Sequence, residues 1–116
     1  MPDVTVEEWQ LLSFFEVEPK LLDADAPWFY NTATYKVEQG PFSLKFSIAP
    51  AGFDVRIVLR HGGHLLYKLN AILVKDVRYK ADVNDERLEI LINDHESLGF
   101  RLKPHIELTH SIDEFH

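Results

Sequence analysis

The chain has 116 residues, no cysteine and a net charge of −7, and 46% of its residues are hydrophobic. This length is typical of a single domain, residues 1–116, with enough apolar side chains to form a core without disulfide bonds. The lack of cysteine excludes disulfides, thiolate metal sites and a cysteine nucleophile, and it favours a reducing compartment, so we expect a cytoplasmic protein. No apolar run approaches the roughly 18 residues of a membrane-spanning helix, and the N-terminus has no signal-peptide pattern.

The charge is unevenly distributed along the chain. Residues 1–28 carry seven acids and one base, residues 29–81 carry three acids and eight bases, and residues 82–116 carry nine acids and three bases. Binding to phosphates requires a concentrated basic surface, so the acidic ends argue against nucleic acid as the partner. They are compatible with a basic protein partner, or with ordinary solubility.

The first expected element is a helix over about residues 6–16. Thr5 and Glu8 have the spacing of a capping box, and Glu8 also suits the positive end of the helix dipole. Apolar residues at intervals of three or four, from Trp9 to Phe15, give the helix one face for packing on a sheet. The same face could alternatively dock to a partner.

The strands begin after a short connecting segment. The run Trp28–Glu38 is rich in aromatic and β-branched residues and is predicted to be a strand. Phe42–Ile48 and Phe53–Leu59 each alternate apolar and polar residues, with a proline- and glycine-containing turn between them, which predicts a hairpin with one buried face. Lys45 and Asp54, on the polar face, are predicted to pair across this hairpin.

A Gly-Gly turn follows the central hairpin. It is flanked by His61 and His64, which we expect to face each other across the strand ends. The next run, Leu65–Val74, is almost continuously apolar, so its buried face cannot be assigned. The apolar parity shifts after this run, which predicts a bulge or turn at Lys75 and Asp76.

The remaining sequence adds further alternating strands with short turns. Pro104 interrupts the last of them, because proline cannot donate a ladder hydrogen bond and therefore lies at a sheet edge or at a break. We expect a mainly β fold, α+β by strict count: an antiparallel meander of six to eight strands over about residues 28–108, with the short helix packed on it and a polar tail at 109–116. A strongly curved sheet forming a roll is favoured, and a sandwich stays open.

The sequence contains no catalytic pattern. Two imidazoles, His61 and His64, could bind a divalent metal, but such a site usually needs a third ligand, and solvated turn residues are the simpler interpretation. No serine lies in a nucleophile elbow, and no glycine pattern forms a phosphate cradle. We therefore predict no cofactor, no metal site and no enzymatic activity.

The aromatic residues of the strands leave two further possibilities. They could line a pocket for an apolar ligand, although filling the core is the simpler interpretation. The residues concerned are Phe29, Tyr35, Phe42, Phe46, Phe53 and Phe100. Alternatively, Tyr67 and Tyr79 could join basic strand residues in a face for single-stranded nucleic acid, which the acidic ends oppose. The basic residues concerned are Arg56, Arg60, Lys68, Lys75, Arg78 and Lys80.

These patterns favour a non-catalytic protein-binding module. Its most concrete form is an acidic inhibitor or immunity-type protein that neutralises a basic partner. Two groups of acids are the candidate contact residues: Glu16, Glu18, Asp23 and Asp25, and Asp82, Asp85, Glu86 and Glu89. The alternatives are a β-domain that binds an apolar small molecule and a homo-oligomeric accessory subunit, such as a homodimer.

Overall fold

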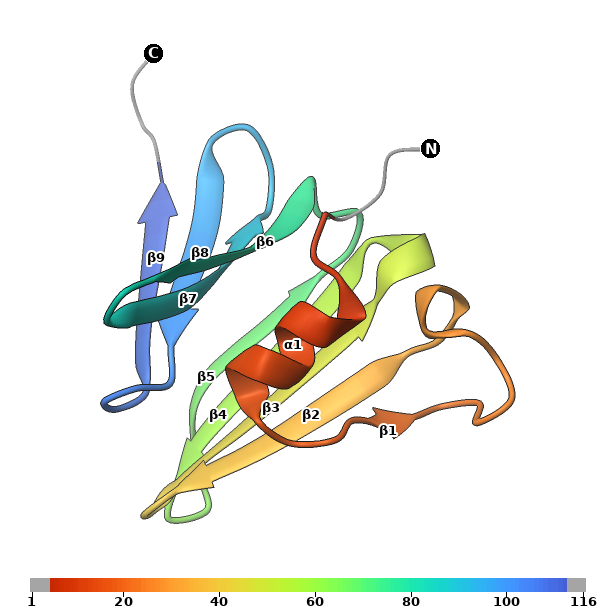
Figure 1. Cartoon of the computed structure of the whole chain (residues 1–116). Helices are drawn as coiled ribbons and strands as arrows, with labels where there is room; N and C mark the ends of the chain where they lie inside the picture. The colour runs from red at the N-terminus through yellow and green to blue at the C-terminus, as the bar shows by residue number, and fades with distance from the viewer. Residues whose placement is uncertain (1–4, 113–116) are drawn as a thin grey trace.

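The computed structural model describes residues 5–112, which form two antiparallel β-sheets and one N-terminal helix (Figure 1). The helix is α1 (Glu8–Phe15). The first sheet contains, in spatial order, β1 (Lys20–Leu21), β2 (Ala33–Gln39), β3 (Phe42–Ala49), β4 (Asp54–His61) and β5 (His64–Ala71). The second sheet contains β6 (Asp76–Asp82), β7 (Asp85–Leu91), β8 (Glu96–Arg101) and β9 (Glu107–Ile112). The expected antiparallel, mainly β fold with one N-terminal helix is confirmed.

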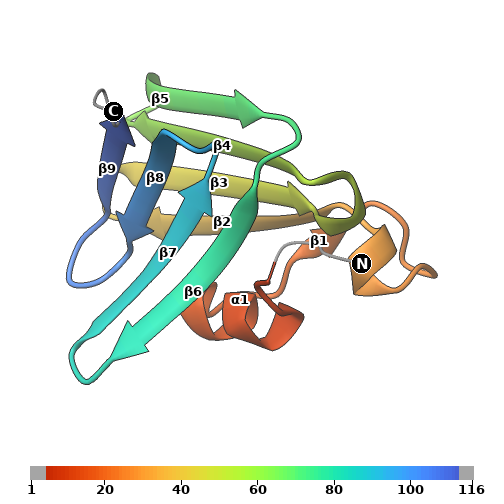
Figure 2. The ribbon, with the colours of Figure 1, turned by 90° about the horizontal axis from the view of Figure 1, so that it is seen from above.

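The strands are divided between two facing sheets rather than arranged in one curved sheet. Figure 2 shows the second sheet lying across the first, with the strands of the two sheets crossing. Across the interface the rings of Phe46 in β3 and Phe100 in β8 lie 5.8 Å apart. The chain changes sheet at residues 72–75, close to the predicted parity shift, and Leu73 adopts a φ of 55° there. Of the two arrangements left open by the sequence, the sandwich is therefore the one present.

Helix α1 packs against both sheets. The ring of Phe15 stacks on Tyr35 of β2 at 4.9 Å and lies 5.2 Å from Phe46 of β3. The ring of Phe14 meets Phe100 of β8 edge-on at 5.5 Å. All five rings are buried, so they fill the space between the sheets with one another. This arrangement favours core filling over an apolar ligand pocket for the residues of this cluster.

The helix begins two residues later than predicted. Its N-cap is Glu7, whose backbone N–H donates to the side-chain oxygen of Gln10 at 2.8 Å. The predicted N-cap at Thr5 is wrong because Thr5 binds a distant side chain instead of the helix. Its backbone N–H and its hydroxyl donate to the carboxylate of Asp76 at 2.7 and 3.1 Å. The helix ends at Glu16, which has a φ of 59°.

The central hairpin has the predicted buried face. Leu44, Phe46 and Ile48 of β3 and Val55 and Ile57 of β4 are fully buried, as the alternation predicts. These side chains line the inner face of the first sheet, where they join the hydrophobic core that also includes side chains of helix α1.

The predicted pair between Lys45 and Asp54 is wrong. In the register of β3 and β4, Lys45 lies opposite Val58, and Asp54 lies opposite Ala49 at the end of the ladder. The turn, a 3-10 helix at Pro50–Gly52, fixes this register, so the two charges lie too far along the hairpin to pair.

Two other segments differ from expectation. Trp28–Tyr30 is a 3-10 helix, and the predicted strand begins only at Ala33. Residues 109–112 belong to β9 and not to a polar tail, whereas residues 113–116 lie outside the described part of the chain. Pro104 lies in the connection between β8 and β9, so the predicted break is confirmed.

The apolar run Leu65–Val74 forms β5 and the crossing between the sheets. Leu65 and Leu66 lie exposed near the start of β5, while Tyr67 packs against the core. Within the described residues, no helix is long and apolar enough to cross a membrane.

Candidate functional site

The eight candidate carboxylates lie in two places. The first acidic group lies at the C-terminal end of α1, beside β1 and in the loop after β1, and it contains Glu16, Glu18, Asp23 and Asp25. The second acidic group lies on the β6–β7 hairpin, and it contains Asp82, Asp85, Glu86 and Glu89. The partners that each carboxylate already has decide whether it stays available to another molecule.

Ion pairs neutralise much of the second acidic group. Asp85 accepts from Nε of Arg101 at 3.1 Å, and Glu89 lies 3.2 Å from Nζ of Lys80. Asp82 accepts the backbone N–H of Val83 at 2.8 Å within its own turn. Asp85 and Glu89 are therefore neutralised on the second sheet, whereas Asp82 has no cationic partner among the described residues.

Glu86 is the fourth member of the second acidic group, and it also has a partner. It accepts a hydrogen bond from the hydroxyl of Tyr79, and this bond raises the pKa of Tyr79. The hydrogen bond holds the carboxylate of Glu86 against β6.

The first acidic group is less neutralised. Glu16 forms an ion pair with Lys103, and this contact raises the pKa of Lys103. Glu18 and Asp25, in contrast, form no ion pair or side-chain hydrogen bond within residues 5–112. Asp23 accepts the backbone N–H of Asp25 at 3.0 Å and has no cationic partner in the same range. The available negative charge therefore lies around β1 and the loop after it.

The loop after β1, residues 22–32, is organised by the buried side chain of Asn31, which is 4% exposed. Its Oδ1 accepts from the N–H groups of Asp23 and Thr32, each at 3.1 Å. Its Nδ2 donates to the carbonyl oxygens of Asp23 at 2.6 Å and Ala26 at 3.0 Å. One side chain thus joins both ends of the loop and fixes its shape. We call residues 22–32 the β1–β2 loop.

The β1–β2 loop exposes two large apolar side chains. Leu22 is 83% exposed and Tyr30 is 73% exposed, although the backbone around them is held by Asn31. The ring of Tyr30 rests edge-on against Phe29 at 5.1 Å. Figure 1 and Figure 2 show this loop (orange) projecting beside the first sheet. Exposed aromatic and aliphatic groups on a fixed backbone are typical anchors of protein interfaces.

A hollow of about 360 Å³ adjoins the β1–β2 loop. Leu22 forms one wall, and the outer face of the first sheet forms the floor, with Asp54 and Arg56 among its lining residues. Asp54 forms no ion pair with another described residue. The hollow therefore extends the loop surface with a further free carboxylate.

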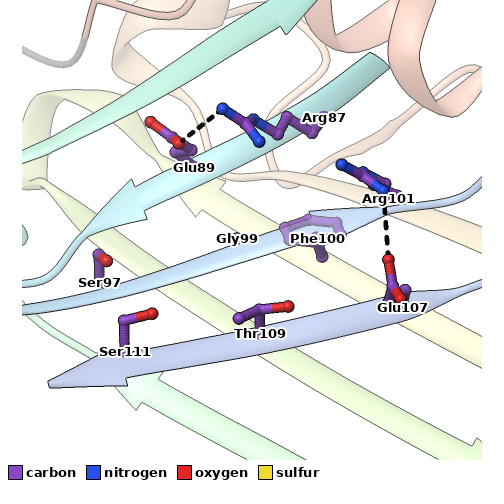
Figure 3. Close-up of a pocket in the computed structure, with 9 residues that line it drawn as sticks. All are labelled: Arg87, Glu89, Ser97, Gly99, Phe100, Arg101, Glu107, Thr109 and Ser111. Carbon is purple, nitrogen blue, oxygen red and sulfur yellow. Dashed lines mark hydrogen bonds and ion pairs between the residues drawn. The ribbon is translucent and has the colours of Figure 1, made fainter. Parts of the chain in front are cut away.

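A second hollow lies on the outer face of the second sheet, over Gly99 (Figure 3). It has a volume of about 260 Å³. Its charged walls are paired: Arg87 lies 3.6 Å from Glu89, and Arg101 lies 3.4 Å from Glu107. The hydroxyl side chains that complete it are those of Ser97, Thr109 and Ser111. The charges of this hollow are balanced internally.

Basic side chains gather on the outer face of the first sheet. They are Lys36, Lys45, Arg56, Arg60 and Lys68. All five are exposed, and none forms an ion pair within the described chain. Tyr67 and Tyr79, which the nucleic-acid hypothesis placed beside such residues, pack against the core instead. The combined basic and aromatic face of that hypothesis is therefore not formed.

His61 and His64 lie opposite each other in the register of β4 and β5, as expected. Gly62 and Gly63 between them adopt φ values of 55° and 87°, which suit a two-residue hairpin turn. Across residues 5–112, no group of three or more histidine or acidic side chains is placed to hold a metal ion. The ring of His61 instead packs edge-on against Phe42 at 4.8 Å.

The sequence did not identify Leu22, Tyr30 or Asn31 as functional candidates. The aromatic run from Trp28 hid Tyr30 and Asn31, because it resembles the start of a strand, while Leu22 lies in the connecting segment before that run. Pro27 and Asn31, both common in turns, bracket that run and were the available signal for a loop.

No family model and no curated protein sequence matches the chain. Among solved structures, it is similar to a chain of the contact-dependent growth inhibition toxin–immunity protein complex from Klebsiella pneumoniae 342. The TM-score is 0.76 at 20% sequence identity, and the alignment covers 91% of this chain and 93% of that chain. The two chains therefore share a fold along almost their whole lengths.

Proposed function

We propose that this chain is a non-catalytic, immunity-type protein that binds a protein toxin in the cytoplasm and blocks it. The observation that carries the proposal is the fold that it shares, over nearly the full length of both chains, with a chain of a toxin–immunity protein complex. Because fold alone does not fix function, the charge distribution supplies the second support. A small acidic protein with free carboxylates suits a basic enzyme as its partner.

The carboxylates steer the partner in this proposal. Glu18, Asp23 and Asp25 are the members of the first acidic group that lack a cationic partner among the described residues. The second acidic group contributes a weaker field, because its charges are paired within the sheet. We expect the association rate constant to fall steeply as salt is raised, since exposed charges more than about 8–10 Å apart are screened at physiological ionic strength.

The test takes the product of a gene next to that of this chain as the candidate toxin domain. The domain is expressed in bacteria with and without the chain, and growth is followed. We expect growth arrest by the toxin domain alone, rescue by the chain, and a stable complex of the two proteins in size-exclusion chromatography. Growth arrest that the chain does not relieve, with no complex formed, would refute the proposal.

A further inference from the structure

We infer that the β1–β2 loop is the anchor by which this protein holds its partner, and that the partner presents a basic surface with an apolar pocket to receive Tyr30 and Leu22. The inference rests on the proposed function and assigns a contact surface to it. It selects the first acidic group over the second as the place of contact.

The first argument is that the loop is preorganised. The buried Asn31 makes four hydrogen bonds that tie Asp23, Ala26 and Thr32 together. The 3-10 helix of the loop, Trp28–Tyr30, also packs against the 3-10 helix Pro50–Gly52 of the first sheet. A loop fixed before binding loses little conformational entropy when a partner arrives, so its contacts translate more fully into affinity.

The second argument is the kind of side chain that the loop exposes. Tyr30 is 73% exposed and Leu22 is 83% exposed, although large apolar groups gain free energy by leaving water. Tyrosine is among the residue types that dominate binding energy at the centre of interfaces, where neighbouring groups exclude water. A rigid loop that keeps both side chains in solvent is suited to inserting them into a partner.

The third argument is charge complementarity. Asp23 and Asp25 belong to the same loop as the exposed apolar pair, and Glu18 lies just before β1. None of the three has a cationic partner in the described chain, and Lys20 is the single base of residues 16–31. The adjoining hollow of about 360 Å³ is lined by the carboxylate of Asp54 and by Arg56, so its charges are mixed and the acidic rim is supplied by the loop itself. An apolar centre with an acidic rim fits a basic surface of the partner.

The β6–β7 hairpin also adjoins a hollow, of about 460 Å³, with Val83 and Asp82 in its lining, but Lys103 lines the same hollow. The hollow over Gly99 has paired charges, and the second acidic group is held by Arg101, Lys80 and Tyr79. Val83, in the β6–β7 turn, is 90% exposed beside Asp82 and so gives a matched pair of apolar and acidic residues outside the inferred surface.

The experiment measures the affinity of the full chain for the toxin domain encoded by the neighbouring gene, by isothermal titration calorimetry. The test variant combines Leu22→Ala with Tyr30→Ala. The control variant combines Val83→Ala with Ile112→Ala, which also truncates two exposed apolar side chains. We expect the Kd to rise by more than about tenfold for the test variant and to change by less than about twofold for the control.

A second pair of variants tests the charges. Glu18→Gln with Asp25→Asn is compared with Glu8→Gln and Glu38→Gln, and each pair removes two exposed carboxylates. We expect the first pair to slow association by about threefold or more at low salt and the second pair to leave it near the wild-type value.

The outcomes separate this inference from the proposed function. If the wild-type chain binds the toxin domain and both loop variants bind it equally well, the partner is held elsewhere and the inference alone is overturned. If the wild-type chain does not bind the toxin domain at all, the proposed function fails and the inference fails with it. All substituted residues are exposed, and matched thermal unfolding curves confirm that each variant is folded.

Discussion

The carboxylate of Asp76 accepts hydrogen bonds from the backbone N–H of Thr5 at 2.7 Å and from its hydroxyl at 3.1 Å. The same side chain accepts the N–H of Val77 at 2.8 Å and pairs with Nε of Arg78 at 3.0 Å. Asp76 is 7% exposed, so it is a buried acid that is satisfied from several directions. It fastens the segment before α1 to the first residue of β6, 71 positions along the chain.

Replacing Asp76 by alanine removes the acceptor of the buried N–H of Val77 and of the partly buried N–H of Thr5. We therefore expect Asp76→Ala to lower the free energy of unfolding by about 1–3 kcal/mol. Chemical denaturation measures this change. Asp94→Ala is the control, because Asp94 pairs with Lys75 at the surface, and its effect should be clearly smaller. Equal effects of the two variants would contradict the role given to Asp76.

Phe15 is the side chain of α1 that reaches both sheets. Its ring stacks on Tyr35 and approaches Phe100 at 6.2 Å. We expect Phe15→Ala to cost about 3–5 kcal/mol of unfolding free energy, since it removes a fully buried ring. Trp9→Ala, on the same helix but 59% exposed, should cost much less. The urea midpoints of the two variants compare their stabilities directly. A similar loss of stability in both would contradict the packing of helix α1 through Phe15.

Tyr35 makes the folded protein less stable as the pH rises in the alkaline range. Burial raises the pKa of its hydroxyl to about 12, whereas an unfolded tyrosine has a pKa near 10. The neutral form is therefore favoured in the folded protein, so the stabilisation is complete below about pH 10 and is lost as pH rises towards 12. We expect Tyr35 to contribute a loss of up to about 1.4 kcal/mol per pH unit in this window, so the slope should be smaller in Tyr35→Phe than in the wild type and unchanged in Tyr30→Phe. Denaturation at pH 9 and above is the measurement, and identical slopes in all three proteins would refute this prediction.

The same hydroxyl has no hydrogen-bond partner among the described residues, and neither has Nε1 of Trp28. Burial raises the pKa of Tyr35, and the N–H of Trp28 lowers that pKa to a smaller extent, so removing the hydroxyl loses at most a weak interaction with Trp28. At neutral pH we expect Tyr35→Phe to be as stable as the wild type, or more stable by less than about 1 kcal/mol. This makes it a suitable variant for isolating the alkaline effect.

Asn31→Ala tests whether one side chain holds the β1–β2 loop. We expect faster hydrogen exchange at the amides of Asp23 and Thr32, which lose their acceptor, while the amides of β3 keep their protection. Exchange followed by NMR or mass spectrometry measures the difference. Unchanged exchange at Asp23 would mean that the backbone holds the loop without Asn31.

Gly99→Thr tests whether the hollow over Gly99, and not the β1–β2 loop, is the contact surface. Gly99 lies within β8, and a Cβ there would meet only the carbonyl oxygen of Leu88 at 4.0 Å, so the larger residue fits. Threonine also favours strands over glycine by up to about 1 kcal/mol. We expect equal or higher stability and, if the proposed partner is a toxin domain, unchanged affinity for it, measured by calorimetry. Loss of binding in this stable variant would move the contact surface to the second sheet.

The sequence predicted the core better than the surface. Burial of Leu44, Phe46, Ile57 and their neighbours follows from alternation, because one face of each strand must leave water. The start of α1 was placed wrongly because Asp76, far along the chain, takes Thr5 away from the helix cap. A pattern of neighbouring residues cannot reveal a hydrogen-bond acceptor as distant in sequence as Asp76.

The candidate site shows the same division. The charge of the eight acids is visible in the sequence, but their partners depend on register: Asp85 meets Arg101 only because β7 and β8 are neighbours. The same is true of Lys45 and Asp54, which the hairpin register keeps apart. The exposure of Tyr30 depends on the 3-10 helix that Pro27 and Asn31 bracket, and its aromatic neighbours suggested a strand instead.

Each sheet is built from one continuous stretch of chain, and every strand pairs with its neighbour in sequence. Hairpins of this kind form in about 1–10 μs, without waiting for distant segments. Helix α1, by contrast, completes its contacts only when both sheets are present, since Phe14 and Phe15 touch the two. We therefore expect the helix to dock after the rate-limiting step of folding. Substitutions in α1 should then accelerate unfolding and leave the refolding rate almost unchanged, so the helix governs how long the native state lasts.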